Sequence, residues 1–95
     1  MKLDTIAKKL KANGFVEGED RKGRMVHPEN TDFIVNLYYD YECEEIEIGD
    51  FRNYASIPVF SIKTVGVNSK PDGIEIDIGL NDNSCEIHLF CAFDK

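Results

Sequence analysis

Two alternating stretches near the C-terminus bring groups that could do chemistry into register. Ile74–Leu80 and Cys85–Phe93 alternate apolar with other side chains on either side of a polar turn, which predicts a β-hairpin. If the residues that flank the turn face each other, Asp77 lies opposite His88. A carboxylate that orients an imidazole is the second half of a nucleophilic triad.

No nucleophile accompanies this pair. Ser84 falls in the turn, and Cys85 is expected on the opposite, apolar face of the hairpin. Paired carboxylates such as Glu42 and Glu44 are common in the chain, but nothing in the pattern marks a pocket around them. We therefore predict no catalytic residues and a protein that is not an enzyme.

The soft metal ligands are scattered. His27, His88, Cys43, Cys85 and Cys91 form no C-x-x-C or H-x-x-x-H pair. An odd number of cysteines at irregular spacing is also no disulfide framework. The sequence predicts core cysteines, no metal site and no cofactor.

Charge is divided unevenly along the chain. Residues 1–25 hold seven Lys/Arg and four acids, a net +3, whereas residues 26–95 hold four Lys/Arg and fourteen acids, a net −10. The whole chain carries −7. Fields of this kind govern encounter and exclusion, so the acidic part should repel nucleic acid and attract basic protein surfaces.

Carboxylates are interleaved with aromatics at positions predicted to share one outward sheet face. Glu75 falls opposite Phe90 in the predicted hairpin. An exposed Phe on a strand lowers the solubility of a protein unless a binding partner covers it. This face is either a partner-binding surface or a solvated outer face that keeps the protein soluble. The candidate partner-binding residues are Tyr38, Asp40, Glu42, Glu75, Asp77, Glu86 and Phe90.

A second candidate surface is basic. It would contact phosphates as a nucleic-acid-binding patch, or be only the wet side of an amphipathic helix and a charged loop. Its residues are Lys8, Lys9, Lys11, Arg21, Lys22 and Arg24.

The elements that would position these residues can be read from periodicity. Asp4 is predicted to cap a helix that ends at Asn13–Gly14, with Phe15 folded back on its apolar stripe. Phe15–Glu17 and Arg24–His27 are predicted to form a hairpin.

The strand that begins at Phe33 must turn or bulge near Tyr41–Glu45, where its alternation slips. Ile57–Val67 is apolar on both faces, which indicates a central strand. We predict a single α+β domain over residues 1–95, with one N-terminal helix packed on a five- or six-stranded antiparallel sheet in two layers.

Residues 3–40 resemble the first half of the HicA-type toxins, small RNA-cleaving proteins of dsRNA-binding-like fold. The resemblance lies in a helix, then Asn13-Gly14-Phe15, Arg21-Lys22-Gly23 and His27-Pro28 between strands. It implies a related α-β-β-β start. The family's catalytic His follows the Gly between the first strands, where this chain has Arg24-Met25, so no catalytic residue is carried over.

In size, acidity and architecture the chain is similar to small phage-encoded inhibitors such as the uracil-DNA glycosylase inhibitor and several anti-restriction and anti-CRISPR proteins. This implies a non-enzymatic inhibitor, a nucleic-acid mimic that occupies the basic, nucleic-acid-binding surface of a partner protein. The alternatives are a divergent HicA-like nucleic-acid-associated module and a homo-oligomeric accessory protein.

Location follows from what the sequence does not contain. After Met1 there is no apolar stretch like that of a signal peptide, and no apolar run approaches the roughly 20 residues of a membrane span. We therefore expect a cytoplasmic protein with no membrane partner.

Overall fold

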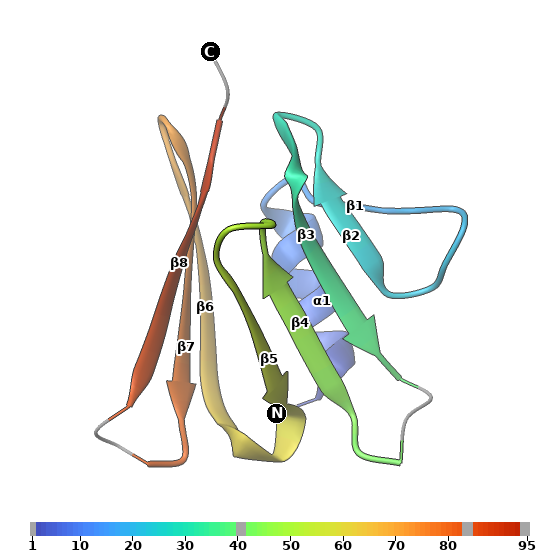
Figure 1. Cartoon of the computed structure of the whole chain (residues 1–95). Helices are drawn as coiled ribbons and strands as arrows, with labels where there is room; N and C mark the ends of the chain where they lie inside the picture. The colour runs from blue at the N-terminus through green and yellow to red at the C-terminus, as the bar shows by residue number, and fades with distance from the viewer. Residues whose placement is uncertain (1, 40–41, 83–84, 94–95) are drawn as a thin grey trace.

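The structure is a computed structural model that describes residues 2–39, 42–82 and 85–93. Within these ranges the chain forms one α-helix, one 3₁₀ turn and eight strands (Figure 1). In chain order they are α1 (Leu3–Ala12), β1 (Val16–Glu17), β2 (Arg24–His27), β3 (Asn30–Tyr38), β4 (Glu45–Gly49), β5 (Tyr54–Pro58), η1 (Val59–Ser61), β6 (Ile62–Lys70), β7 (Gly73–Leu80) and β8 (Glu86–Ala92).

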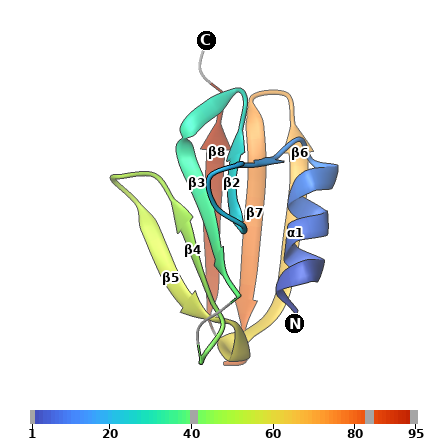
Figure 2. The ribbon, with the colours of Figure 1, turned by 90° about the vertical axis from the view of Figure 1, so that its right-hand side faces the viewer.

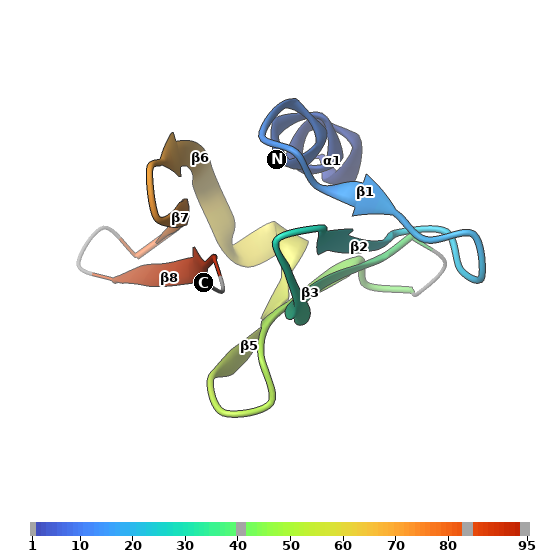
Figure 3. The same ribbon diagram turned by 90° about the horizontal axis from the view of Figure 1, so that it is seen from above.

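The strands make two antiparallel sheets, with orders β1-β2-β3-β4-β5 and β6-β7-β8. The predicted α+β class is confirmed, whereas the expected single sheet of five or six strands is divided in two. The sheets face each other, and α1 covers the open side beside β6 (Figures 2 and 3). No helix of the described residues is long and apolar enough to cross a membrane.

The division falls inside a segment predicted as one central strand. Over Ile57–Val67 the chain instead ends β5 at Pro58, makes the turn η1 and starts β6 at Ile62. Proline has no N–H to donate to a ladder, so it is confined to strand ends and edges. The prediction of a central strand was therefore wrong: both β5 and β6 are edge strands.

Helix α1 begins slightly earlier than predicted and ends where predicted. Its N-cap is Lys2, without a side-chain hydrogen bond, so Asp4 lies in the first turn instead of capping it. At the other end Gly14 has a φ of +93°, which favours glycine. The N–H of Phe15 donates to the Leu10 carbonyl at 3.1 Å, and the Phe15 ring is buried.

An aromatic stack joins the two sheets at one end of the core. The buried His27 ring lies between Phe15 and Phe93, with ring centroids 5.4 and 4.8 Å away. Beside it, Asn30 Nδ2 donates to the Ala92 carbonyl at 2.7 Å. Together these contacts hold the end of β8 against the β2–β3 hairpin.

The β7–β8 hairpin has the predicted register. Asp77 pairs with His88 and Glu75 with Phe90. The inward side chains of β7 are Ile74, Ile76 and Ile78, all at most 2% exposed. Cys91 is buried as predicted, but Cys85 precedes β8 and is exposed, so it does not join the apolar face.

We expect Ile76→Ala to lower the free energy of unfolding by about 2–5 kcal/mol, because it opens a cavity at a fully buried position between the sheets. Urea unfolding followed by circular dichroism measures this. Asn68→Ala, at an exposed position of the neighbouring strand β6, should change the same quantity by less than about 0.5 kcal/mol. Equal losses for the two variants would contradict the packing described here.

Candidate functional site

The predicted partner-binding residues fall in two places. Tyr38 lies at the end of β3, on the outer face of the five-stranded sheet. Glu42 is exposed after β3 and lines a hollow with Phe60. Asp40 lies outside the described residues. The remaining four residues come together on the outer face of the other sheet, and these are Glu75, Asp77, Glu86 and Phe90.

We call the outward side of this hairpin the acidic β7–β8 face, comprising Glu75, Asp77, Glu86, His88 and Phe90. The Phe90 ring is 44% exposed and lies over Gly73. A Cβ at Gly73 would meet the ring at 2.5 Å, so the absence of a side chain there makes room for the ring. Gly73 therefore allows the ring of Phe90, the residue paired with Glu75, to lie over β7.

His88 holds two of the carboxylates together. Its Nδ1 lies 2.5 Å from Asp77 Oδ1, and its Nε2 lies 3.1 Å from Glu86 Oε2. The hydrogen bond to Asp77, with the negative charges of Asp77 and Glu86, raises the pKa of His88. Within the described ranges Glu75 has no ion-pair partner. The arrangement can present a carboxylate and an aromatic ring to a cation.

Tyr38 belongs to a separate network on the other sheet. Its hydroxyl donates to Glu47, and this bond raises the pKa of Tyr38. The Arg21 guanidinium lies 4.5 Å from the centre of the Tyr38 ring. Tyr38 is therefore held between a cation and a carboxylate of its own chain.

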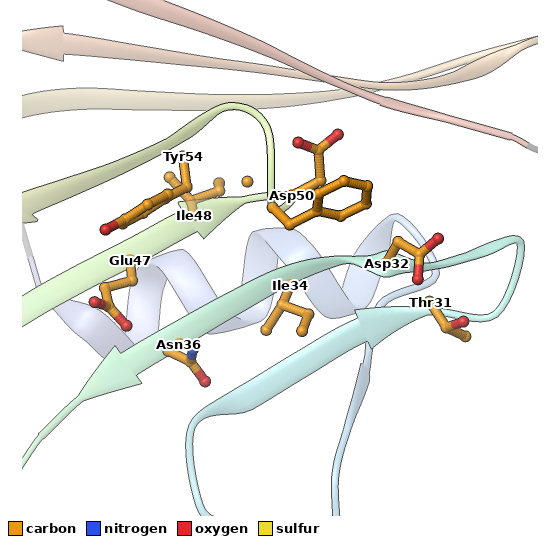
Figure 4. Close-up of a pocket in the computed structure, with 10 residues that line it drawn as sticks. Thr31, Asp32, Ile34, Asn36, Glu47, Ile48, Asp50 and Tyr54 are labelled. Atoms are coloured by element: carbon orange, nitrogen blue, oxygen red, sulfur yellow. The ribbon is translucent and has the colours of Figure 1, made fainter.

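The same outer face contains a pocket that the sequence analysis missed (Figure 4). Phe51 and Tyr54, 80% and 68% exposed, stand at its rim beside Gly49. Its volume is about 340 Å³. The lining consists of Thr31, Asp32, Ile34, Asn36, Glu47, Ile48, Gly49, Asp50, Phe51 and Tyr54.

This lining mixes acidic and apolar groups and contains no Lys, Arg, His or Cys. The buried Asn36 Oδ1 has no hydrogen-bond partner among the described residues. Asp50 accepts the N–H groups of Asn53 and Arg52, which lower its pKa and close the tight turn before β5. Two bulky aromatics around this Asp-Asn turn were the available signal in the sequence.

Four of the six basic candidates contact their own chain. Lys11 Nζ lies 3.4 Å from Glu17 Oε1, and Arg24 lies 3.9 Å from Asp20. Arg21 stacks on Tyr38 as described, and Lys22 Nζ lies 4.6 Å from the centre of the Tyr39 ring. The other two are Lys8, which is exposed, and Lys9, which is partly buried.

The described residues contain no cluster of three or more His, Cys, Asp or Glu that could hold a metal ion. His27 is stacked in the core and Cys91 is buried, whereas Cys43 and Cys85 are exposed.

Comparison with protein-family models, with curated proteins and with solved structures finds no match for this chain. The α-β-β-β order implied by the HicA resemblance is present as α1-β1-β2-β3, and a further strand, β4, follows.

We expect the imidazole of His88 to titrate above 6.5, and Asp77→Asn to lower its pKa, because the hydrogen bond to Asp77 is the largest cause of the rise. Stabilisation by this cluster should be fully present below the unfolded pKa near 6.5 and be lost as pH rises through the higher folded pKa. NMR titration of the ring protons measures the pKa in each variant, and urea unfolding over the same pH range measures the stabilisation.

Asp32→Asn is the matched control, since it removes the same charge from the other sheet. It should leave the titration of His88 unchanged. An equal pKa change in both variants would show that net charge, and not the pairing across β7 and β8, raises the pKa.

Proposed function

We propose that this protein is a non-enzymatic binding protein that uses the acidic β7–β8 face to occupy a basic surface of a partner protein. The observation that carries the proposal is the co-location of Glu75, Asp77, Glu86 and Phe90 on adjacent strands. The ring would supply a buried anchor, and the carboxylates would supply steering and pairing with Lys or Arg.

The outward positions of β7 and β8 are strongly biased in charge. None of them is Lys or Arg, and the only cationic group is His88, which is already held by Asp77 and Glu86. These positions are Gly73, Glu75, Asp77 and Gly79 on β7, and Glu86, His88, Phe90 and Ala92 on β8. Along these positions a basic partner meets no like charge other than His88, which Asp77 and Glu86 compensate.

A nucleic-acid-binding surface of a partner protein carries Lys and Arg side chains that neutralise phosphates. Such a basic surface is complementary in charge to the acidic β7–β8 face. Glu75 and Asp77 are two residues apart on one strand, about 7 Å, and can pair with successive cations of such a surface. Occupation by this protein would then exclude nucleic acid from the partner. The function is inhibition by competition, of the kind used by phage-encoded inhibitors.

Direct nucleic-acid binding through the basic residues has less support. Arg21 and Lys22 lie over tyrosine rings, and Lys11 and Arg24 lie beside carboxylates. Phosphate contacts would compete with these interactions, and the net charge of −7 opposes the approach of a polyanion.

The test compares two triple variants with the same net charge. Glu75→Gln/Asp77→Asn/Glu86→Gln neutralises the acidic β7–β8 face, and Glu19→Gln/Glu29→Gln/Asp32→Asn neutralises exposed acids elsewhere. Partners are captured from host lysate, eluted with a salt gradient, purified and titrated against each variant. Since exposed ion pairs contribute ~0.2–1 kcal/mol each, we expect the first triple to weaken affinity by about tenfold.

The control triple should retain most of the affinity. Equal weakening by both triples would show that only net charge matters and would overturn the assignment of the face. Binding of labelled RNA or DNA at low salt, lost when Lys8, Lys9 and Lys11 are neutralised, would favour the nucleic-acid module instead.

A further inference from the structure

We infer that the partner is received as an added β-strand: an extended segment with alternating basic and apolar side chains pairs with the free edge of β8. The inference rests on the proposed function and specifies the partner for the same site. It joins three features of β8, namely its open edge, its half-buried inward side chains and the acidic face beside it.

Strand β8 is the last strand of its sheet. It pairs with β7 on one side, and its other side faces away from α1, at the opening between the two sheets (Figure 3). An unpaired strand edge is a template for another strand, because its N–H and C=O groups already have the spacing of a ladder.

The backbone direction of β8 follows from two hydrogen bonds at its ends. Leu80 N–H donates to the Cys85 carbonyl, and Phe93 N–H donates to the Asp72 carbonyl. The odd-numbered residues of this strand therefore direct their backbone N–H and C=O groups toward β7. In an antiparallel strand the groups of alternate residues point to opposite sides. The even-numbered residues therefore direct their N–H and C=O groups to the open edge.

One of these outward groups is already occupied. The Ala92 carbonyl accepts Asn30 Nδ2 at 2.7 Å, which agrees with the direction just derived and closes the C-terminal end of the edge. The backbone groups of Glu86, His88 and Phe90 have no partner within the described residues. Three residues are enough for a short ladder.

The side chains of β8 define what the added strand must carry. Ile87 and Leu89 face the core but are only half-buried, so apolar side chains at the inward positions of an added strand would complete their burial. Its outward positions would lie beside Glu86 and the Asp77–His88 pair, where Lys or Arg is favoured.

The other exposed edges are poorer templates. The edge of β6 is engaged by Asn13, whose Nδ2 donates to the Val67 carbonyl. The edge of β5 ends in Pro58, which has no N–H, and β1 has only two residues. A second copy of this chain at β8 would place like charges side by side, so a partner of opposite charge is favoured.

The test removes one outward N–H without removing the strand. His88→Pro deletes the N–H that points to the open edge, and proline is tolerated on an edge strand at such a position. His88→Thr removes the imidazole but keeps the N–H. The probe is a short labelled peptide in which lysine and valine alternate, and binding is measured by fluorescence anisotropy at low salt.

We expect His88→Pro to bind this peptide about tenfold more weakly than His88→Thr, because a ladder hydrogen bond is lost and the ring obstructs the edge. An isomeric peptide with the same lysines and valines in two blocks should bind weakly to both variants. If His88→Pro does not fold by circular dichroism, Glu86→Pro against Glu86→Thr makes the same comparison at the first residue of β8.

The outcomes separate the two proposals. Equal binding of the two peptides, with no effect of proline, overturns strand addition while the charge-based function stands on the triple variants. Failure of both peptides to bind overturns strand addition, whatever the triple variants show. A dimer in sedimentation that His88→Pro dissociates would assign the edge to a second copy and also overturn the inference.

Discussion

Pro58 limits how this chain can pair. A segment that is apolar on both faces would suit the middle of one large sheet, but Pro58 pairs with β4 on one side and has no N–H to donate to a further strand on the other. The chain turns through η1, and the strands after it form a second sheet that faces the first. The acidic β7–β8 face and the pocket beside Phe51 consequently lie on opposite outer surfaces, with one shared core between them.

Local pattern was sufficient for features that depend on neighbouring residues. The β7–β8 register followed from alternation around one turn, and the end of α1 followed from Asn13–Gly14. Alternation cannot specify which sheet a strand joins, because an outward residue has the same period in either sheet. Tyr38 and Glu75 were therefore predicted on one face, although the structure places them on different sheets. The pocket was missed since one of its aromatics, Phe51, lies within a turn and the other, Tyr54, directly follows it.

Contacts within the chain explain why the basic residues are less available to a partner than the carboxylates of the acidic β7–β8 face. In the β1–β2 loop the cations Arg21 and Lys22 are satisfied by rings of the adjacent strand β3 and the residue after it. Across β7 and β8 the only such compensation is His88, which serves two carboxylates at once. The net charge of −7 is therefore distributed unevenly over the surface. Carboxylate charge that no cation compensates lies on the acidic β7–β8 face, beside the open edge of β8.

The strand orders also bear on how the molecule assembles. Every paired strand is adjacent in sequence to its partner, in both sheets. Ladders of this kind close short loops and can grow hairpin by hairpin, which keeps the entropic cost of each step small. Contacts between the sheets span much longer separations, as in the stack of Phe15 and His27 with Phe93. We therefore expect folding kinetics in which two meanders form quickly and their docking, with closure of this stack, is the slow event.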